Sequence, residues 1–231
     1  MKRTLKKSGF TLVEMLVVVA IISIILSVVL FNYRDVESKS VLKNIAYEVA
    51  LTIRESQSYG LGVKKYIPGG GSFTPGDNIF NRSYGVQVND GAGESKNIYL
   101  FSDADGNGIC ADCVNGTCTG AGECRQMLTL HSGAEIQNIC LEAYNGNSQT
   151  TQTRCTDTSQ FFSASVRFQR PNPDAKFTPG DINGNMQGSL PSGFNNPMGM
   201  EVTLVNPRSP GYGQKIEVTA LGQVSVYGVS I

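Results

Sequence analysis

Six cysteines between residues 110 and 155 admit two kinds of chemistry. They are Cys110, Cys113, Cys118, Cys124, Cys140 and Cys155. Cysteine thiolates bind metals, whereas oxidised cysteines pair as disulfides. Structural zinc sites usually present two well-separated pairs of ligands, and the tight run of the first four cysteines does not. We therefore expect disulfides, with Cys140 paired to Cys155, and the pairing of the other four stays open.

A short acidic run precedes these cysteines. Residues 103–108 read Asp-Ala-Asp-Gly-Asn-Gly, which matches the opening of an EF-hand loop, with oxygen ligands at alternate residues and glycine at the sixth position. The twelfth position is Val114 instead of a bidentate glutamate, so the full motif fails. Asp112 or Glu123 is available as a further carboxylate. The run is compatible with a calcium site, and a plain Asp/Gly turn between two strands is the alternative. The candidate ligands are Asp103, Asp105, Asn107 and Asp112.

Glu14 lies within a segment that is otherwise almost entirely apolar. Between Phe10 and Phe31 the polar residues are Thr11, Glu14, Ser23 and Ser27. A carboxylate at mid-bilayer costs about 2–3 kcal/mol, so such residues usually have a function. The alternative is an acid near a helix end whose side chain reaches the membrane surface.

Other chemistries find little support. The chain has 19 basic and 19 acidic residues, so it has no basic excess to hold a nucleic acid backbone. Its one histidine, His131, lies at the end of an expected strand, and no serine stands in a Gly-x-Ser-x-Gly elbow. The glycine clusters precede no helix, so no phosphate-binding loop is expected. We expect a protein that is not an enzyme and that requires no cofactor.

The elements that must position these residues fall in series. Residues 1–9 carry four basic residues and no acid. Residues 10–31 are expected to form a helix about 33 Å long, enough to span the hydrocarbon core of a bilayer, which is about 30 Å thick. This segment is longer than the apolar region of a cleaved secretory signal. The basic residues predict a single-pass protein of the cytoplasmic membrane with its N-terminus in the cytoplasm. The remainder is then extracytoplasmic, where disulfides are the default.

The rest of the chain predicts an α+β protein. Apolar residues at three- and four-residue spacing continue the helix over residues 32–59, and Gly60 and Gly62 end it. A β-rich domain follows over residues 60–231, as an antiparallel sheet or small sandwich. Its strands are expected at 84–88, 98–101, 127–130, 134–139, 161–169, 200–205, 214–220 and 223–227. Long polar connections are expected at 68–83, 103–125, 145–160 and 171–199.

The run Lys6-Lys7-Ser8-Gly9-Phe10-Thr11-Leu12-Val13-Glu14 resembles the prepilin N-terminal motif of type IV pilins and type II secretion pseudopilins. The resemblance implies a pilin-like fold, cleavage between Gly9 and Phe10 by a prepilin peptidase, and N-methylation of Phe10 by the same enzyme. It implies further partners: other pilin or pseudopilin subunits, an inner-membrane assembly platform and, before assembly, the lipid bilayer. Glu14 is then expected to neutralise the Phe10 amine of a neighbouring subunit, because two buried charges are tolerable as a pair.

Shorter strings in the outer domain resemble the GspH/FimT-like minor pseudopilins. They include Tyr84-Gly85-Val86, Phe168-Gln169-Arg170-Pro171 and Gly222-Gln223-Val224-Ser225-Val226. This resemblance implies a minor filament subunit. The alternative function is a membrane-anchored extracytoplasmic binding module that does not polymerise, with calcium as a candidate stabilising ion. The sequence does not separate a secretion pseudopilus from a type IV pilus.

Overall fold

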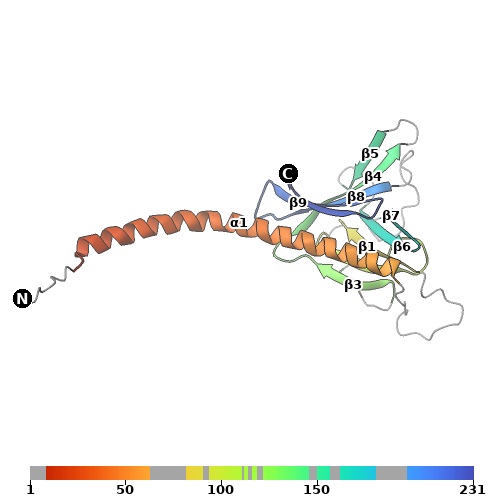
Figure 1. The fold of residues 1–231 in the computed structure, drawn as a ribbon, viewed down its shortest axis with the longest axis horizontal. Coiled ribbons are helices and arrows are strands. Elements are labelled where there is room, and N and C mark those ends of the chain that lie inside the picture. The colour runs from red at the N-terminus through yellow and green to blue at the C-terminus, as the bar shows by residue number, and fades with distance from the viewer. Residues whose placement is uncertain are drawn as a thin grey trace, which may run out of the picture.

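The computed structural model has one long helix, whose second half lies on a domain of two β-sheets (Figure 1). The structure describes residues 9–62, 82–90, 94–110, 112–113, 116–118, 122–145, 150–156, 162–180 and 197–231. The expected α+β fold class, a long N-terminal helix packed on antiparallel sheets, is confirmed. Residues 1–8 of the leader and most of the connection expected at 68–83 lie outside the described residues.

The strands form two antiparallel sheets of five strands each. The first sheet has the order β3-β2-β1-β6-β7, and the second has the order β10-β9-β8-β4-β5. The helix contacts β1 and β6 of the first sheet and β9 and β10 of the second. The elements are α1 (Leu12–Leu61), β1 (Ser83–Asn89), β2 (Asn97–Asp103), β3 (Cys124–Thr129), β4 (Glu135–Asn145), β5 (Thr150–Cys155), β6 (Ser163–Gln169), β7 (Asn172–Gly180), β8 (Pro197–Val205), β9 (Tyr212–Thr219) and β10 (Val224–Ser230).

The helix begins and ends a little later than the sequence predicts. It begins at Leu12 because Thr11 is extended and its hydroxyl accepts a hydrogen bond from the Glu14 amide at 3.2 Å, an N-cap. It ends at Gly62, whose amide donates to the Ser58 carbonyl at 2.9 Å. Gly60, expected to end the helix, lies inside it. A Cβ there would overlap the Phe168 carbonyl oxygen, so glycine lets α1 approach β6.

The second half of α1 supplies one side of the main core. Its apolar residues recur at three- and four-residue spacing, and they are buried against the inward faces of both sheets. The helical residues of this core are Leu42, Ile45, Ala46, Val49, Ala50 and Ile53. The first half, by contrast, makes no such contact and is exposed throughout Leu12–Leu30.

Two strands lie where polar connections were expected, so these predictions are wrong. β5 falls within residues 145–160, and β7 falls within residues 171–199. β5 is threonine-rich and pairs on one side with β4, so it carries little apolar signal. β7 contains Pro173 and Pro179, which an edge strand tolerates because one row of its amides makes no ladder bond.

The strands β1 and β2 of the first sheet are buried on both faces. Along β2, Ile98 and Leu100 face the main core, whereas Tyr99 and Phe101 face a second cluster built with Cys110, Cys113 and Cys124. The described parts of residues 103–125 therefore cover the outer face of this sheet, which is why β1 and β2 are buried along their full length.

Candidate functional site

The bond between Gly9 and Phe10 lies outside the helix. Gly9, Phe10 and Thr11 precede the first helical residue, and Phe10 is 76% exposed. A Cβ at Gly9 would meet nothing within 4 Å. The Thr11 cap fixes this boundary, because it makes the helix begin at Leu12, two residues after Phe10. The peptide bond is thus presented to solvent in a non-helical segment, which a protease requires to reach a backbone.

Glu14 differs from the other polar residues of the apolar segment. Ser23 donates to the Val19 carbonyl at 2.8 Å, and Ser27 donates to the Ser23 carbonyl at 3.0 Å. Both hydroxyls are therefore satisfied within the helix, as the Thr11 hydroxyl is by the Glu14 amide. Among the residues that the structure describes, the Glu14 carboxylate has no such partner. It is the one polar side chain of this segment that calls for a group from elsewhere.

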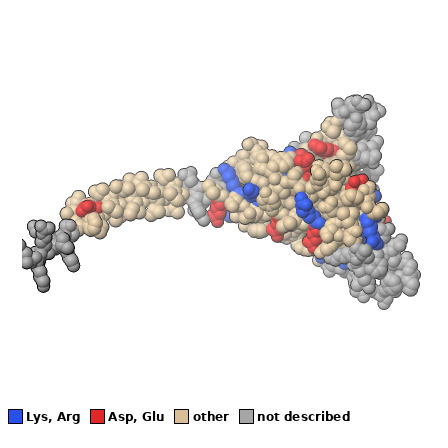
Figure 2. Space-filling view, in the orientation of Figure 1, with Lys and Arg blue, Asp and Glu red and all other residues tan. Residues whose placement is uncertain are grey.

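The helix around Glu14 is apolar on every side. Leu12–Leu30 has a mean hydropathy of 3.0, and none of it is buried by the rest of the chain. Figure 2 shows this part of the molecule as a nearly uncharged rod, with the charged side chains gathered on the β domain. Such a segment is long enough to cross a bilayer and equally able to pack against other apolar helices.

Residues 4–30 match the family model of the prokaryotic N-terminal methylation motif. This match supports the type IV pilin and pseudopilin superfamily and a pilin-like protein that a prepilin peptidase processes. The motif together with the apolar helix suggests a membrane-anchored structural subunit that assembles with other pilins. No curated protein and no solved structure matches the chain.

Beyond the prepilin-type motif, the six cysteines form three disulfides. The structure pairs Cys140 with Cys155, the pair that the sequence favours, and these residues face each other across β4 and β5. The other bonds join neighbours in sequence within the covering loop, Cys110 to Cys113 and Cys118 to Cys124.

Buried polar side chains of the first sheet hold this covering loop in place. Gln87 accepts from the Cys110 amide at 2.8 Å, and Asn89 donates to the Cys113 carbonyl at 2.9 Å. The Tyr99 hydroxyl donates to Glu94 at 2.6 Å and accepts from the Gly116 amide at 3.1 Å. Burial and the adjacent Glu94 carboxylate raise the pKa of Tyr99 above its usual range. The loop is therefore fixed by the sheet beneath it as well as by its disulfides.

The expected calcium loop is closed by its own hydrogen bonds. One oxygen of Asp103 accepts from the Gly106 amide at 2.8 Å, and the other accepts from Ser83 at 2.9 Å and from the Arg167 guanidinium. Asp105 accepts from the Asn107 amide at 3.0 Å. Arg167 therefore already supplies a positive charge to the most buried carboxylate of the loop.

The predicted ligands are only partly brought together. Carboxylate oxygens of Asp103, Asp105 and Glu123 lie within 4.8 Å of one another. The Asp112 carboxylate lies instead within 4.8 Å of the Cys110 sulfur and the Glu123 carboxylate. It accepts a hydrogen bond from the Glu123 amide at 3.1 Å. Calcium binding thus stays a prediction, and Glu123 replaces Asp112 in the set that the geometry would favour.

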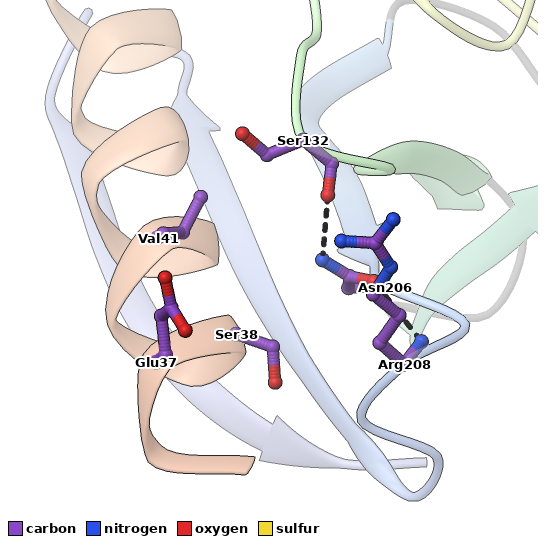
Figure 3. Close-up of a pocket in the computed structure, with 6 residues that line it drawn as sticks. All are labelled: Glu37, Ser38, Val41, Ser132, Asn206 and Arg208. Atoms are coloured by element: carbon purple, nitrogen blue, oxygen red, sulfur yellow. Dashed lines mark hydrogen bonds between the residues drawn. The ribbon is translucent and has the colours of Figure 1, made fainter. Parts of the chain in front are cut away.

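A pocket of about 580 Å³ lies where α1 enters the β domain. Figure 3 shows Glu37, Ser38 and Val41 on the helix facing Ser132 and Asn206. Asn206 donates to the Ser132 carbonyl at 3.2 Å and accepts from the Arg208 amide at 3.0 Å, so it fixes the two loops at the mouth. The described residues that line it include no histidine, cysteine or pair of carboxylates.

Sequence reasoning missed the roles of Thr11 and Arg167. Thr11 and Glu14 have the Thr-x-x-Glu spacing of a capping box, which would have placed the helix start at Leu12. Arg167 had no local signal, because its partner Asp103 is 64 residues away and only strand pairing brings them together.

Proposed function

We propose that this chain is a minor subunit of a type IV pilus or type II secretion filament. A prepilin peptidase cleaves it after Gly9 and methylates Phe10, and the subunit then enters the filament through the apolar part of α1. The observation that carries the proposal is Glu14, a carboxylate without a partner among the described residues, within a segment whose other polar groups are satisfied. After cleavage the new Phe10 amine of a neighbouring subunit carries the complementary charge. Each of the two charges is costly to bury alone, so burial in the filament favours their pairing.

The minor role rests on the resemblance of short strings to the GspH/FimT-like proteins. In the fold these strings meet at the end of α1. The Tyr59 and Tyr84 rings pack edge to face, with their centroids 5.7 Å apart. Cβ atoms at Gly60 and Gly222 would both crowd Phe168. The strings thus describe how the helix docks on the sheets. Quantitative mass spectrometry of purified filaments tests the minor role, and a copy number equal to that of the main subunit would reject it.

The assembly step is tested with Glu14→Leu and Glu14→Gln, expressed with a prepilin peptidase. We expect both variants to reach the membrane and lose residues 1–9, but to be missing from the sheared filament fraction, because the charge is absent. Thr11→Val is the matched control, since it removes the helix cap and keeps the carboxylate.

Each outcome separates one step from another. Normal recovery of Glu14→Leu in filaments would reject the role of Glu14 in assembly. Loss of cleavage in that variant would move the role of Glu14 to recognition by the peptidase. Absence of cleavage in the unmodified chain would favour the membrane-anchored module that does not polymerise.

A further inference from the structure

The strand β10 lies at the edge of the second sheet. It pairs with β9 over seven residue pairs, from Val224 with Val218 to Ser230 with Tyr212, without a shift of register. A long regular edge exposes a row of backbone donors and acceptors that another strand can join.

Two hydrogen bonds define which backbone groups of β10 face outward. The Thr219 amide donates to the Gln223 carbonyl at 3.0 Å, and the Ile231 amide donates to the Gly211 carbonyl at 3.3 Å. Because an antiparallel ladder alternates, the odd-numbered residues of β10 face β9 and the even-numbered ones face away. The Val224 carbonyl follows this pattern and faces away from β9, since it accepts a hydrogen bond from the Arg54 side chain at 3.2 Å.

The other outward groups of β10 lie on one half-buried and two exposed residues. They belong to Val226, Gly228 and Ser230, of which the last two are exposed. No strand in the described part of the chain pairs with them. The edge therefore offers three amides and three carbonyls at the spacing of a β-ladder.

The other three sheet edges carry protection that β10 lacks. Disulfides tie β3 and β5, which also carry Arg125 and Arg154. β7 carries Pro173 and Pro179, and proline blocks pairing on the outer side of an edge strand. Val224–Ser230 contains no charge, proline or cysteine. An edge left open in a protein that closes its other edges indicates a place for a partner.

The face beside this edge is acidic. Glu201 and Glu217 are directly opposite each other on β8 and β9, and Tyr227 of β10 contacts Glu201 at 3.5 Å. Lys215 pairs with Glu201 at 2.9 Å and leaves the group negative overall. The negative charges of Glu201 and Glu217 also add to the raised pKa of Glu142, so the carboxylates act on one another.

We propose that the free edge of β10 receives a β-strand of a different chain, one that carries lysine or arginine on the side continuing this acidic face. Backbone hydrogen bonds to the even-numbered residues supply the pairing, and the basic residues select the partner. A second copy of this chain fits less well, because β10 has no basic residue and self-pairing would bring two acidic faces together. The pairing is independent of Glu14 and of filament entry.

The first test measures amide exchange by NMR on the full chain in detergent micelles. The probe is a nine-residue peptide in which lysine alternates with valine. We expect the peptide to slow exchange at least tenfold at Val226, Gly228 and Ser230. The amides of Ser225 and Tyr227, which already bond to β9, are expected to change little.

The second test compares Gly228→Pro with Gly228→Ala. Both place a Cβ about 3.1 Å from the Tyr212 hydroxyl, but only proline removes the outward amide. We expect at least tenfold weaker peptide binding for Gly228→Pro, near-normal binding for Gly228→Ala, and similar melting temperatures. If the proline variant fails to fold, the exchange measurement decides alone.

Three results would overturn the proposal. These are unchanged exchange at the even-numbered amides, equal binding of a peptide with glutamate in place of lysine, and protection that rises with protein concentration in the absence of peptide. The last would assign the edge to a second copy. Peptide binding that is normal in Glu14→Leu keeps this test separate from the test of filament assembly.

Discussion

At the scale of single residues, Arg167 stabilises a charge that the fold buries. The Asp103 side chain is fully buried, and Arg167, which is 20% exposed, pairs with it. Breaking a buried ion pair from one side typically costs about 3–5 kcal/mol, because the remaining charge is left without compensation. Pairs exposed to water contribute about 0–1 kcal/mol.

We therefore expect Arg167→Met to lower the free energy of unfolding by about 3 kcal/mol, measured by urea denaturation. Lys96→Met is the matched control, because Lys96 pairs with Glu135 at 3.0 Å on the surface. Equal effects of the two substitutions would show that the Asp103 pair is no stronger than a surface contact.

The contribution of Glu142 to folding stability depends on pH with the opposite sign to that of a carboxylate in an ion pair. Burial, with the charges of Glu201 and Glu217, raises its pKa from 4.5. The folded state therefore holds this proton more tightly than the unfolded state, so its contribution to stability is present below pH 4.5 and is lost as the pH rises through the raised pKa.

Glu142→Gln should accordingly raise the melting temperature at pH 7 and leave it almost unchanged at pH 4. Glu48→Gln, on an exposed helical position, serves as the control and should give little change at either pH. A stabilisation by Glu142→Gln that is the same at both pH values would contradict the electrostatic explanation.

At the scale of the elements, Gly60 controls how closely α1 approaches β6. Alanine favours a helix over glycine by about 1 kcal/mol. At Gly60, however, the added Cβ would overlap the Phe168 carbonyl, and overpacking of this kind costs about 1–3 kcal/mol.

Gly60→Ala is thus expected to lower the melting temperature in spite of its helix preference. Ser58→Ala, on an exposed position of the same turn, should leave the melting temperature unchanged or slightly higher. If Gly60→Ala were stabilising, helix propensity would outweigh the contact with β6, and the glycine would have no packing role.

The elements also separate what sequence patterns can predict from what they cannot. The helix was predictable because its first half is one long apolar run and its second half has apolar residues at three- and four-residue spacing. β5 and β7 were not, since threonine, proline and aspartate carry no apolar alternation, and these strands exist through pairing with β4 and β6. The role of Asp103 was likewise hidden, because its partner Arg167 arrives on β6.

At the scale of the whole molecule, the leader and the rest of the chain differ in net charge. Removing the leader takes four of the 19 basic residues and leaves 15 against 19 acidic ones, a formal charge of −4. The sequence isoelectric point of about 6.6 belongs to the precursor. The mature form should therefore focus at a lower pH.

Isoelectric focusing with and without a prepilin peptidase checks this expectation, together with a mass loss that corresponds to residues 1–9. A Gly9 substitution that blocks cleavage should keep the precursor position. A shift in mass without a shift to lower isoelectric point would place the cut outside the basic leader.

The sequence by itself determined the features that are local in the chain: the prepilin-type motif, the apolar helix, the anomaly of Glu14 and the α+β class. Each depends on residue types at short, regular spacing, which needs no tertiary contact to be recognised. The tertiary structure decided the pairing of the four clustered cysteines, the counter-ion of Asp103, the packing role of Gly60 and the open edge of β10. The cysteine pairing depends on how the loop folds over the first sheet. The other three depend on which distant elements become neighbours, and that follows from sheet order and packing, which single-strand patterns do not encode.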